Sequence, residues 1–302
     1  MNRMPTLQIL DALGVPRPED ERVFPWVRPL SEPLELRGHA AMMETADGGI
    51  LLSAQLAARA PWLEPLAAMV ERDLRLQLVL GRPWVALPPR LLVGPPGAGK
   101  SHWASLLATI AGCGHGALDL AGAVDAKGLE GTSRTWSNAT VAWPVAVAAT
   151  TGSANPLLVV DELDKAGGGP RTGRATSALL SLIEPSTAKA FHDSCLQAPV
   201  DLSQISWVFT ANTLEGIPKP LLSRLQIVEV AGPGPEHAES LVDLVGGDLA
   251  KGWGLSADAV PQLPSSVLRI LREILAEHRS VRAARRVLVA AYRALIERPR
   301  NM

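Results

Sequence analysis

Residues 94–101 constrain this chain more than any other part of the sequence. They fit the pattern G-x-x-x-x-G-K-[ST] and read Gly94, Pro95, Pro96, Gly97, Ala98, Gly99, Lys100 and Ser101. Glycines let the backbone pass close to a phosphate because they carry no Cβ. The N–H groups of such a loop point inward and form an anion site. We expect Lys100 to reach the β- and γ-phosphates of a nucleotide and the Ser101 hydroxyl to bind Mg²⁺.

The flanking segments support this interpretation. Residues 90–93 form a short apolar run, as expected of a buried parallel strand, and residues 102–110 carry apolar side chains at helical spacing. The order strand, loop, helix brings a helix N-terminus against the phosphates. A glycine-rich turn without a ligand is the alternative, and these flanks argue against it.

Apolar runs alternate with helical segments from residue 90 to about residue 230, which predicts an α/β fold with a parallel sheet between helices. The expected strands are 91–93, 117–120, 157–160, 206–210 and 226–230. Before them lie a proline-rich arm and two helical stretches, 50–59 and 62–80, separated at Pro61. The Gly-Pro-Gly-Pro sequence at 232–235 ends the alternating region, and the remaining segments are helical, at 236–248, 265–278 and 281–298. We therefore expect three parts, residues 1–89, 90–231 and 232–302, with Ser280 capping the last helix.

Two acids follow the apolar run 157–160. Asp161 would lie at the carboxyl end of its strand, where Mg²⁺ binds in phosphate-loop proteins. Glu162 would polarise a water molecule against the γ-phosphate. A solvated Asp-Glu pair is the alternative, and it is less favoured with residues 94–101 upstream.

Two further polar residues follow the same logic. Asn212 comes directly after the apolar run 206–210 and Ala211, where it could orient the attacking water. Arg224 lies twelve residues further on. An arginine that neutralises charge in the transition state accelerates phosphoryl transfer by orders of magnitude. Alone, Arg224 would more simply be a surface ion-pair residue.

Taken together, these residues resemble the AAA+ ATPases, and most closely the ATPase module of Lon proteases. The resemblance covers roughly residues 90–290. Residues 161–165 (DELDK) resemble DEIDK of that family, 178–185 (ALLSLIEP) resemble ALLEVLDP, and 199–203 (PVDLS) resemble PFDLS. Residues 210–214 match TANTL, and 217–224 (IPKPLLSR) resemble IPxPLLDR.

The resemblance implies a P-loop sheet domain with a small helical lid domain, and a role for each matching residue. Asn212 corresponds to the first sensor, and Arg224 to the arginine finger that completes the neighbouring subunit's site. Residues 280–282 (SVR) resemble GVR, so Arg282 corresponds to the second sensor in the lid. The alternative for Arg282 is one cation among Arg279, Arg285 and Arg286 on a solvated helix face. The implied ligands are ATP and Mg²⁺.

The implied function is an ATPase that works as a homo-oligomeric ring, with six subunits expected, and remodels or unfolds a protein substrate. The chain ends about 20 residues beyond Arg282, so no peptidase domain is expected in it. The main alternative is a nucleotide-dependent switch or scaffold with slow hydrolysis. Trp136 follows residues 134–135, which match the start of Lon's RTY, so it could grip a polypeptide in the ring's pore or pack beneath its own loop. Residues 167–170 (GGGP) are expected to form a second, flexible loop.

Composition narrows the partners. A net charge of −1 gives no overall basic surface for nucleic acid. No apolar run approaches the 18 residues that would span a membrane, and we expect no signal peptide at the N-terminus. The two cysteines, Cys113 and Cys195, suit a reducing compartment. We therefore expect a cytoplasmic protein whose partners are copies of itself and another protein.

Overall fold

The computed structural model describes residues 4–46, 48–122, 126–166, 172–252, 254, 256 and 260–297. Its centre is a five-stranded sheet in the order β4-β5-β8-β3-β9, in which all neighbouring strands run parallel. The strands are β3 (Arg90–Val93), β4 (His115–Asp119), β5 (Leu157–Asp161), β8 (Ser206–Ala211) and β9 (Gln226–Glu229). The predicted parallel α/β sheet is confirmed, and each expected strand is present close to its expected bounds.

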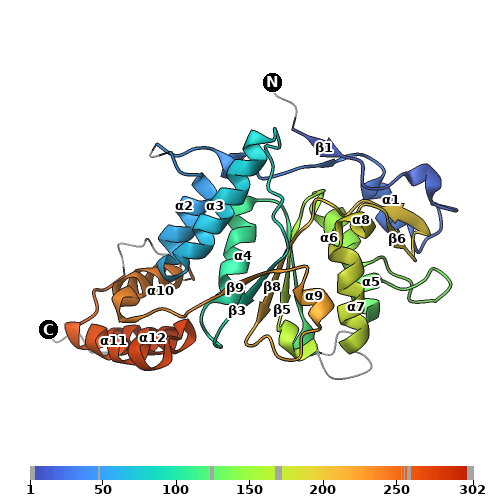
Figure 1. Cartoon of the computed structure of the whole chain (residues 1–302). Coiled ribbons are helices and arrows are strands. Elements are labelled where there is room, and N and C mark those ends of the chain that lie inside the picture. The colour runs from blue at the N-terminus through green and yellow to red at the C-terminus, as the bar shows by residue number, and fades with distance from the viewer. Residues whose placement is uncertain are drawn as a thin grey trace.

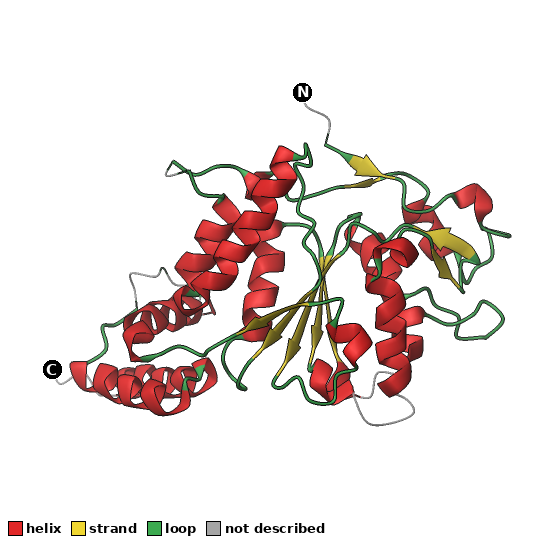
Figure 2. Ribbon diagram, in the orientation of Figure 1, coloured by secondary structure: helices red, strands yellow, loops and turns green. Residues whose placement is uncertain are grey.

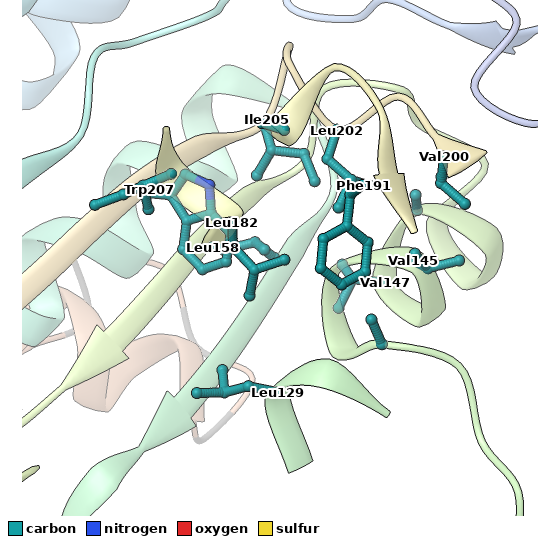
Figure 3. Packing of buried hydrophobic residues seen from close by; sticks show 14 of the residues in the cluster. Leu129, Val145, Val147, Leu158, Leu182, Phe191, Val200, Leu202, Ile205 and Trp207 are labelled. Atoms are coloured by element: carbon teal, nitrogen blue, oxygen red, sulfur yellow. The ribbon is translucent and has the colours of Figure 1, made fainter. Parts of the chain in front are cut away.

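Helices cover both faces of this sheet (Figures 1 and 2). One layer contains α2 (Leu51–Arg59), α3 (Glu64–Val79) and α4 (Lys100–Ala111), and the opposite layer contains α5 (Ala126–Glu130), α6 (Trp143–Thr151) and α7 (Thr172–Ile183). A strand buried on both faces sends alternate side chains into different cores. Leu158 and Phe209 belong to one hydrophobic cluster, whereas Val159 and Val208 belong to the other. Figure 3 shows part of the first cluster, where Leu158 and Trp207 of the sheet lie near Leu182 of α7.

The N-terminal segment packs along one end of this α/β unit. Strand β1 (Thr6–Leu7) pairs with β2 (Leu34–Glu35), and Leu10 forms a bridge with Val200 of a small hairpin. That hairpin and three short helices complete the fold: β6 (Phe191–Asp193), β7 (Ala198–Val200), α1 (Phe24–Leu30), α8 (Pro185–Ala188) and α9 (Lys219–Leu222). Helix α1 was not predicted because it contains Pro25 and Pro29. Pro25 lies in the first turn, where a missing N–H breaks no helical bond.

The C-terminal part is helical, as predicted. Helices α10 (Ala238–Gly252), α11 (Ser265–His278) and α12 (Val281–Glu297) form a group beside the α2–α4 layer (Figure 1). Ser280 caps α12 through a 3.2 Å bond from the Ala283 N–H to its hydroxyl. None of the helices in the described residues is long and apolar enough to cross a lipid bilayer.

The segment between the sheet and the C-terminal helices packs tightly against the turn before α12. Gly232 lies so close to Arg279 that a methyl group on it would overlap the Arg279 carbonyl oxygen. Arg279 itself adopts the left-handed conformation, with φ of 44°, between α11 and α12. Backbone therefore meets backbone at this joint, and no side chain can move aside.

We predict that Gly232→Ala destabilises the protein by about 1–3 kcal/mol, the usual cost of forcing an extra carbon into a filled space. Gly247→Ala in α10 is the matched control, because nothing lies within 4 Å of the added carbon. There, alanine should leave stability unchanged or raise it by about 0.5–1 kcal/mol through helix propensity. Urea unfolding of both variants measures the difference, and equal midpoints would contradict the contact.

Candidate nucleotide site

The loop of residues 94–101 leaves the carboxyl end of β3, where the chain direction across the sheet reverses. From β3 the chain passes through α4 to β4 at one edge, returns through β5 and β8, and ends with β9 on the other side of β3. Ligands of open α/β sheets bind outside the strand ends at such a reversal. Helix α4 begins at Lys100, so its N-terminus is next to the loop.

The loop has the backbone that its glycines were expected to allow. Gly97 and Gly99 have φ values of 84° and 100°, in the left-handed region that residues with a Cβ adopt rarely. A cavity of about 360 Å³ opens beside them. Eight predicted site residues line it: Pro96, Gly97, Gly99, Lys100, Ser101, Glu162, Asn212 and Arg282. Residues far apart in the sequence are thus brought to one site.

The Lys100 ammonium group is fully bonded to the protein itself. It donates to the carbonyl oxygens of Gly94 (2.6 Å) and Pro95 (2.9 Å) and to Oδ1 of Asn212 (3.2 Å). Burial lowers the pKa of Lys100, and the carboxylates of Asp164 and Asp161 partly oppose this shift. A phosphate that binds Lys100 must therefore replace some of these oxygens.

Asp161 and Glu162 are positioned through Thr210 on the neighbouring strand. The register pairs Val160 with Phe209, so the next residues, Asp161 and Thr210, also lie side by side. The Thr210 hydroxyl donates to Oδ1 of Asp161 (2.9 Å) and accepts from the N–H of Glu162 (3.3 Å). Glu162 has a φ of 59°, a strained conformation for a residue with a Cβ. Glu162 also lines the cavity.

Asn212 is brought to the loop by the register of β8 with β3. Val93 pairs with Ala211, and the N–H of Gly94 donates to the Ala211 carbonyl (3.2 Å). The next residue, Asn212, therefore lies at the start of the loop, where its side chain meets Lys100. The sequence placed Asn212 at a strand end, and the register fixes which loop it faces.

Arg282 reaches the cavity because the start of α12 rests on the loop. The Val281 N–H donates to the Gly97 carbonyl (2.8 Å), and a methyl group on Gly97 would lie 3.5 Å from Cβ of Arg282. Arg285 also lines the cavity and pairs with Asp248 of α10 (3.0 Å). Arg286 instead lies along an adjoining hollow with Arg293. Arg282 and Arg285 thus line both the cavity and the hollow, whereas Arg286 and Arg293 line only the hollow.

Arg224 is not among the residues that line this cavity. Its Nε atom donates to Oε2 of Glu184 (2.6 Å), Nη1 donates to the Pro220 carbonyl (2.8 Å), and the side chain is 40% exposed. Asp161, Gly94, Pro95 and Ala98 also fall outside the lining, although Gly94 and Pro95 contact Lys100. Within one chain, Arg224 is a surface ion-pair residue.

The loop that carries Trp136 projects from the side of the molecule between α5 and α6 (Figure 1). Trp136 is 62% exposed, so it does not pack beneath its loop. The base of the loop is held by buried Arg134, which donates to the carbonyls of Pro16 and Cys195. The expected second loop at residues 167–170 lies outside the described residues.

Several cavity residues could not be found by sequence reasoning. Leu244, Val245 and Asp248 come from α10, and His102, Thr210, Ala211 and Val281 also line the cavity. Trp62, which precedes α3, donates from its indole N–H to the Ala98 carbonyl (3.1 Å). No spacing rule connects Trp62 or the α10 residues with the loop, whereas His102 directly follows the loop and Val281 directly precedes Arg282. Thr210 stands two residues before Asn212 on a predicted strand, but its contact with Asp161 follows from the strand order, which the sequence does not give.

The chemistry of these groups fits a magnesium nucleotide. The volume is within the usual 300–1,000 Å³ of ligand pockets. Lys100 and Arg282 supply positive charge for phosphates, and the loop supplies a helix N-terminus. The Ser101 hydroxyl and the Asp161 carboxylate are oxygen donors of the kind that Mg²⁺ prefers.

Comparisons with known proteins give relatives for the central region. Residues 90–232 match the model of the family "ATPase family associated with various cellular activities (AAA)". The Lon protease of Nitrosococcus oceani is 38% identical over 154 residues, which are 51% of this chain and 20% of that protein. A peroxisomal Lon protease homolog 2 of Pichia angusta is 34% identical over 208 residues, 68% of this chain and 22% of that protein. The aligned region therefore spans about a fifth of the length of these relatives.

A solved structure supports the fold. The closed state of Hsp104 with ATPγS and FITC casein superimposes with a TM-score of 0.61, covering 79% of this chain and 45% of that one at 14% identity. At this identity the likeness concerns the fold alone. From the sheet, the loop and these matches, residues 90–232 belong to the AAA family and resemble the ATPase module of Lon proteases.

Proposed function

We propose that this chain binds ATP with Mg²⁺ and hydrolyses it to ADP and phosphate in a ring of identical subunits. The observation that carries the proposal is one cavity lined by Lys100, Ser101, Glu162, Asn212 and Arg282. AAA proteins bind nucleotide as a family, and these five residues supply the charged and hydrogen-bonding groups that ATP hydrolysis needs.

In this proposal each residue has a distinct task. Lys100 leaves the Gly94 and Pro95 carbonyls and binds the β- and γ-phosphates. Glu162 accepts a proton from the water that attacks the γ-phosphate, and Asn212 orients that water. Bound Mg²⁺, held by Ser101 and Asp161, would neutralise charge on the phosphate oxygens. Arg282 links the γ-phosphate to α12, so loss of phosphate can move the C-terminal helices.

Arg224 completes the site from the neighbouring subunit. It lies outside its own cavity and is bound to Glu184, an exposed pair of the kind that contributes little stability. Arg224 can therefore leave Glu184 and bind a phosphate in the neighbouring subunit at a small cost in free energy. A head-to-tail contact that closes on itself makes a ring, and we propose a hexamer.

We further propose that the ring remodels a protein substrate or serves a separate protease in the cytoplasm. The exposed Trp136, on a loop with a fixed base, favours this over a nucleotide-dependent scaffold. Hsp104 was solved with casein, and the other relatives are proteases, so both associate with polypeptides. We assign residues 1–89 to an N-terminal extension, 90–231 to the ATPase domain and 232–302 to the lid domain.

Glu162→Gln should lower the rate of ATP hydrolysis by about 10²–10⁴-fold, the usual contribution of a positioned base. The amide cannot accept the proton, but it keeps the size of the side chain, so ATP affinity should stay within about twofold of the parent protein. Phosphate release and equilibrium binding of labelled ATP measure the two effects. Parent-like turnover would remove Glu162 from the mechanism.

Mixing two inactive variants tests the contribution across the subunit contact. Arg224→Ala keeps an intact cavity, whereas Glu162→Gln keeps Arg224 for its neighbour. Each alone should be nearly inactive, but a random equal mixture places an intact cavity beside an intact arginine at about a quarter of the contacts. We expect ATPase activity to reappear on mixing. If crosslinking shows that the two variants assemble together but the mixture stays inactive, Arg224 does not act in the site of a neighbouring subunit.

Trp136→Ala should leave basal ATPase activity unchanged and abolish its stimulation by unfolded casein. Trp136→Phe should retain most of the stimulation, because an aromatic ring still contacts the polypeptide. Val79→Ala serves as the control, since Val79 is 84% exposed at the end of α3. A parent protein that casein does not stimulate would favour the scaffold.

A further inference from the structure

Two consecutive carbonyl groups of the phosphate loop accept hydrogen bonds from outside the sheet domain. The Val281 N–H, at the start of α12, donates to the Gly97 carbonyl (2.8 Å). The indole N–H of Trp62 donates to the next carbonyl, that of Ala98 (3.1 Å). Both donors lie outside residues 90–232, which match the AAA family model. The loop is thus fixed by parts of the chain on either side of that domain.

Trp62 is held firmly in place to make this contact. It lies in the single turn Pro61–Leu63 between α2 and α3 and is only 9% exposed. Its ring meets the His237 ring edge to face, with centroids 6.2 Å apart and planes at 73°. A tryptophan side chain has one polar hydrogen and no acceptor. The bond to Ala98 therefore satisfies the only polar group of a nearly buried ring.

The direction of the Ala98 carbonyl also sets the direction of the next N–H. A trans peptide is planar, with its C=O and N–H pointing opposite ways, and the described chain contains no cis peptide. With its carbonyl turned toward Trp62, the Ala98–Gly99 peptide turns the Gly99 N–H away from Trp62. Gly99 lines the cavity, and within the described part of the chain its N–H has no protein acceptor.

The loop needs this support because its own sequence does not fix it. Gly97 and Gly99 can adopt positive and negative φ values at little cost in free energy, so the peptide groups around them can flip easily. A methyl group on Gly99 would lie 3.5 Å from the Trp62 indole nitrogen and 3.5 Å from Cγ2 of Val281. Trp62 and Val281 therefore fill the space beside Gly99; Val281 also lines the cavity, whereas Trp62 does not.

We propose that Trp62 is a positioning residue for phosphate binding, whose indole N–H holds the Ala98–Gly99 peptide with the Gly99 N–H facing the phosphates. This inference rests on the proposed binding of ATP. It assigns a task to the N-terminal extension, which supplies a donor that orders the loop before any nucleotide arrives. It also predicts that Trp62 acts on the phosphates and not on the base.

Trp62→Phe tests the inference, because it keeps an aromatic ring and removes the donor. Loss of one hydrogen bond should weaken ATP binding about fivefold. The affinity for inorganic triphosphate, measured by competition against labelled ATP, should fall by the same factor. Triphosphate has no base, so an equal loss assigns the effect of Trp62 to the phosphates. Both affinities are measured on the full chain with Mg²⁺. Trp84→Phe is the matched control, since its indole N–H also makes one bond, to Oε1 of Gln204 (3.0 Å), away from the cavity.

The outcomes separate a role of Trp62 toward the phosphates from a contact with the base and from packing alone. Equal losses for ATP and triphosphate in Trp62→Phe, with none in Trp84→Phe, support the inference. A loss for ATP alone would mean that Trp62 contacts the base, and unchanged binding would mean that it only packs; either overturns the inference. A parent protein that binds neither probe instead overturns the proposed function. Should Trp62→Phe unfold, a benzothienyl analogue of tryptophan at position 62 removes only the N–H and repeats the comparison.

Discussion

The structure depends on holding one flexible loop in one shape. Residues 94–101 contain left-handed glycines, so the shape must come from contacts around them. The sheet supplies one contact, from the Gly94 N–H to the Ala211 carbonyl, and Lys100 supplies others by bonding to the loop's first carbonyls. The N-terminal extension and the C-terminal helices supply the last two. All three parts of the chain therefore meet at the candidate site.

Two cations of the proposed mechanism are held by oxygens of their own chain. Lys100 is bound to two backbone carbonyls and Asn212, and Arg224 to Glu184 and a backbone carbonyl. The bonds of Lys100 satisfy a buried charge that would otherwise lack partners, whereas Arg224 is an exposed charge. Binding of ATP and of a neighbouring subunit would then be exchanges of partners. Such an exchange costs less free energy than ordering mobile side chains, because the side chains of Lys100 and Arg224 are already fixed.

The joint between the sheet and the C-terminal helices can transmit such an exchange. Gly232 and Arg279 meet backbone to backbone, and three residues later Arg282 lines the cavity. Arg285 ties the same helix to Asp248 of α10. Close-packed contacts of this kind move as units and do not deform continuously. A change at the phosphates would therefore reach α10 and α12 together.

The sequence alone determined the sheet, its five strands and the residues at the strand ends, because apolar alternation and the G-x-x-x-x-G-K-[ST] pattern are local signals. It also indicated Arg282, through a short motif. Only the tertiary structure decided which strands are neighbours, and hence that Thr210 holds Asp161 and that Asn212 meets Lys100. It alone showed that Arg224 lies outside its own cavity and that Trp62 and Val281 support the loop, since contacts between distant segments leave no spacing in the sequence to find.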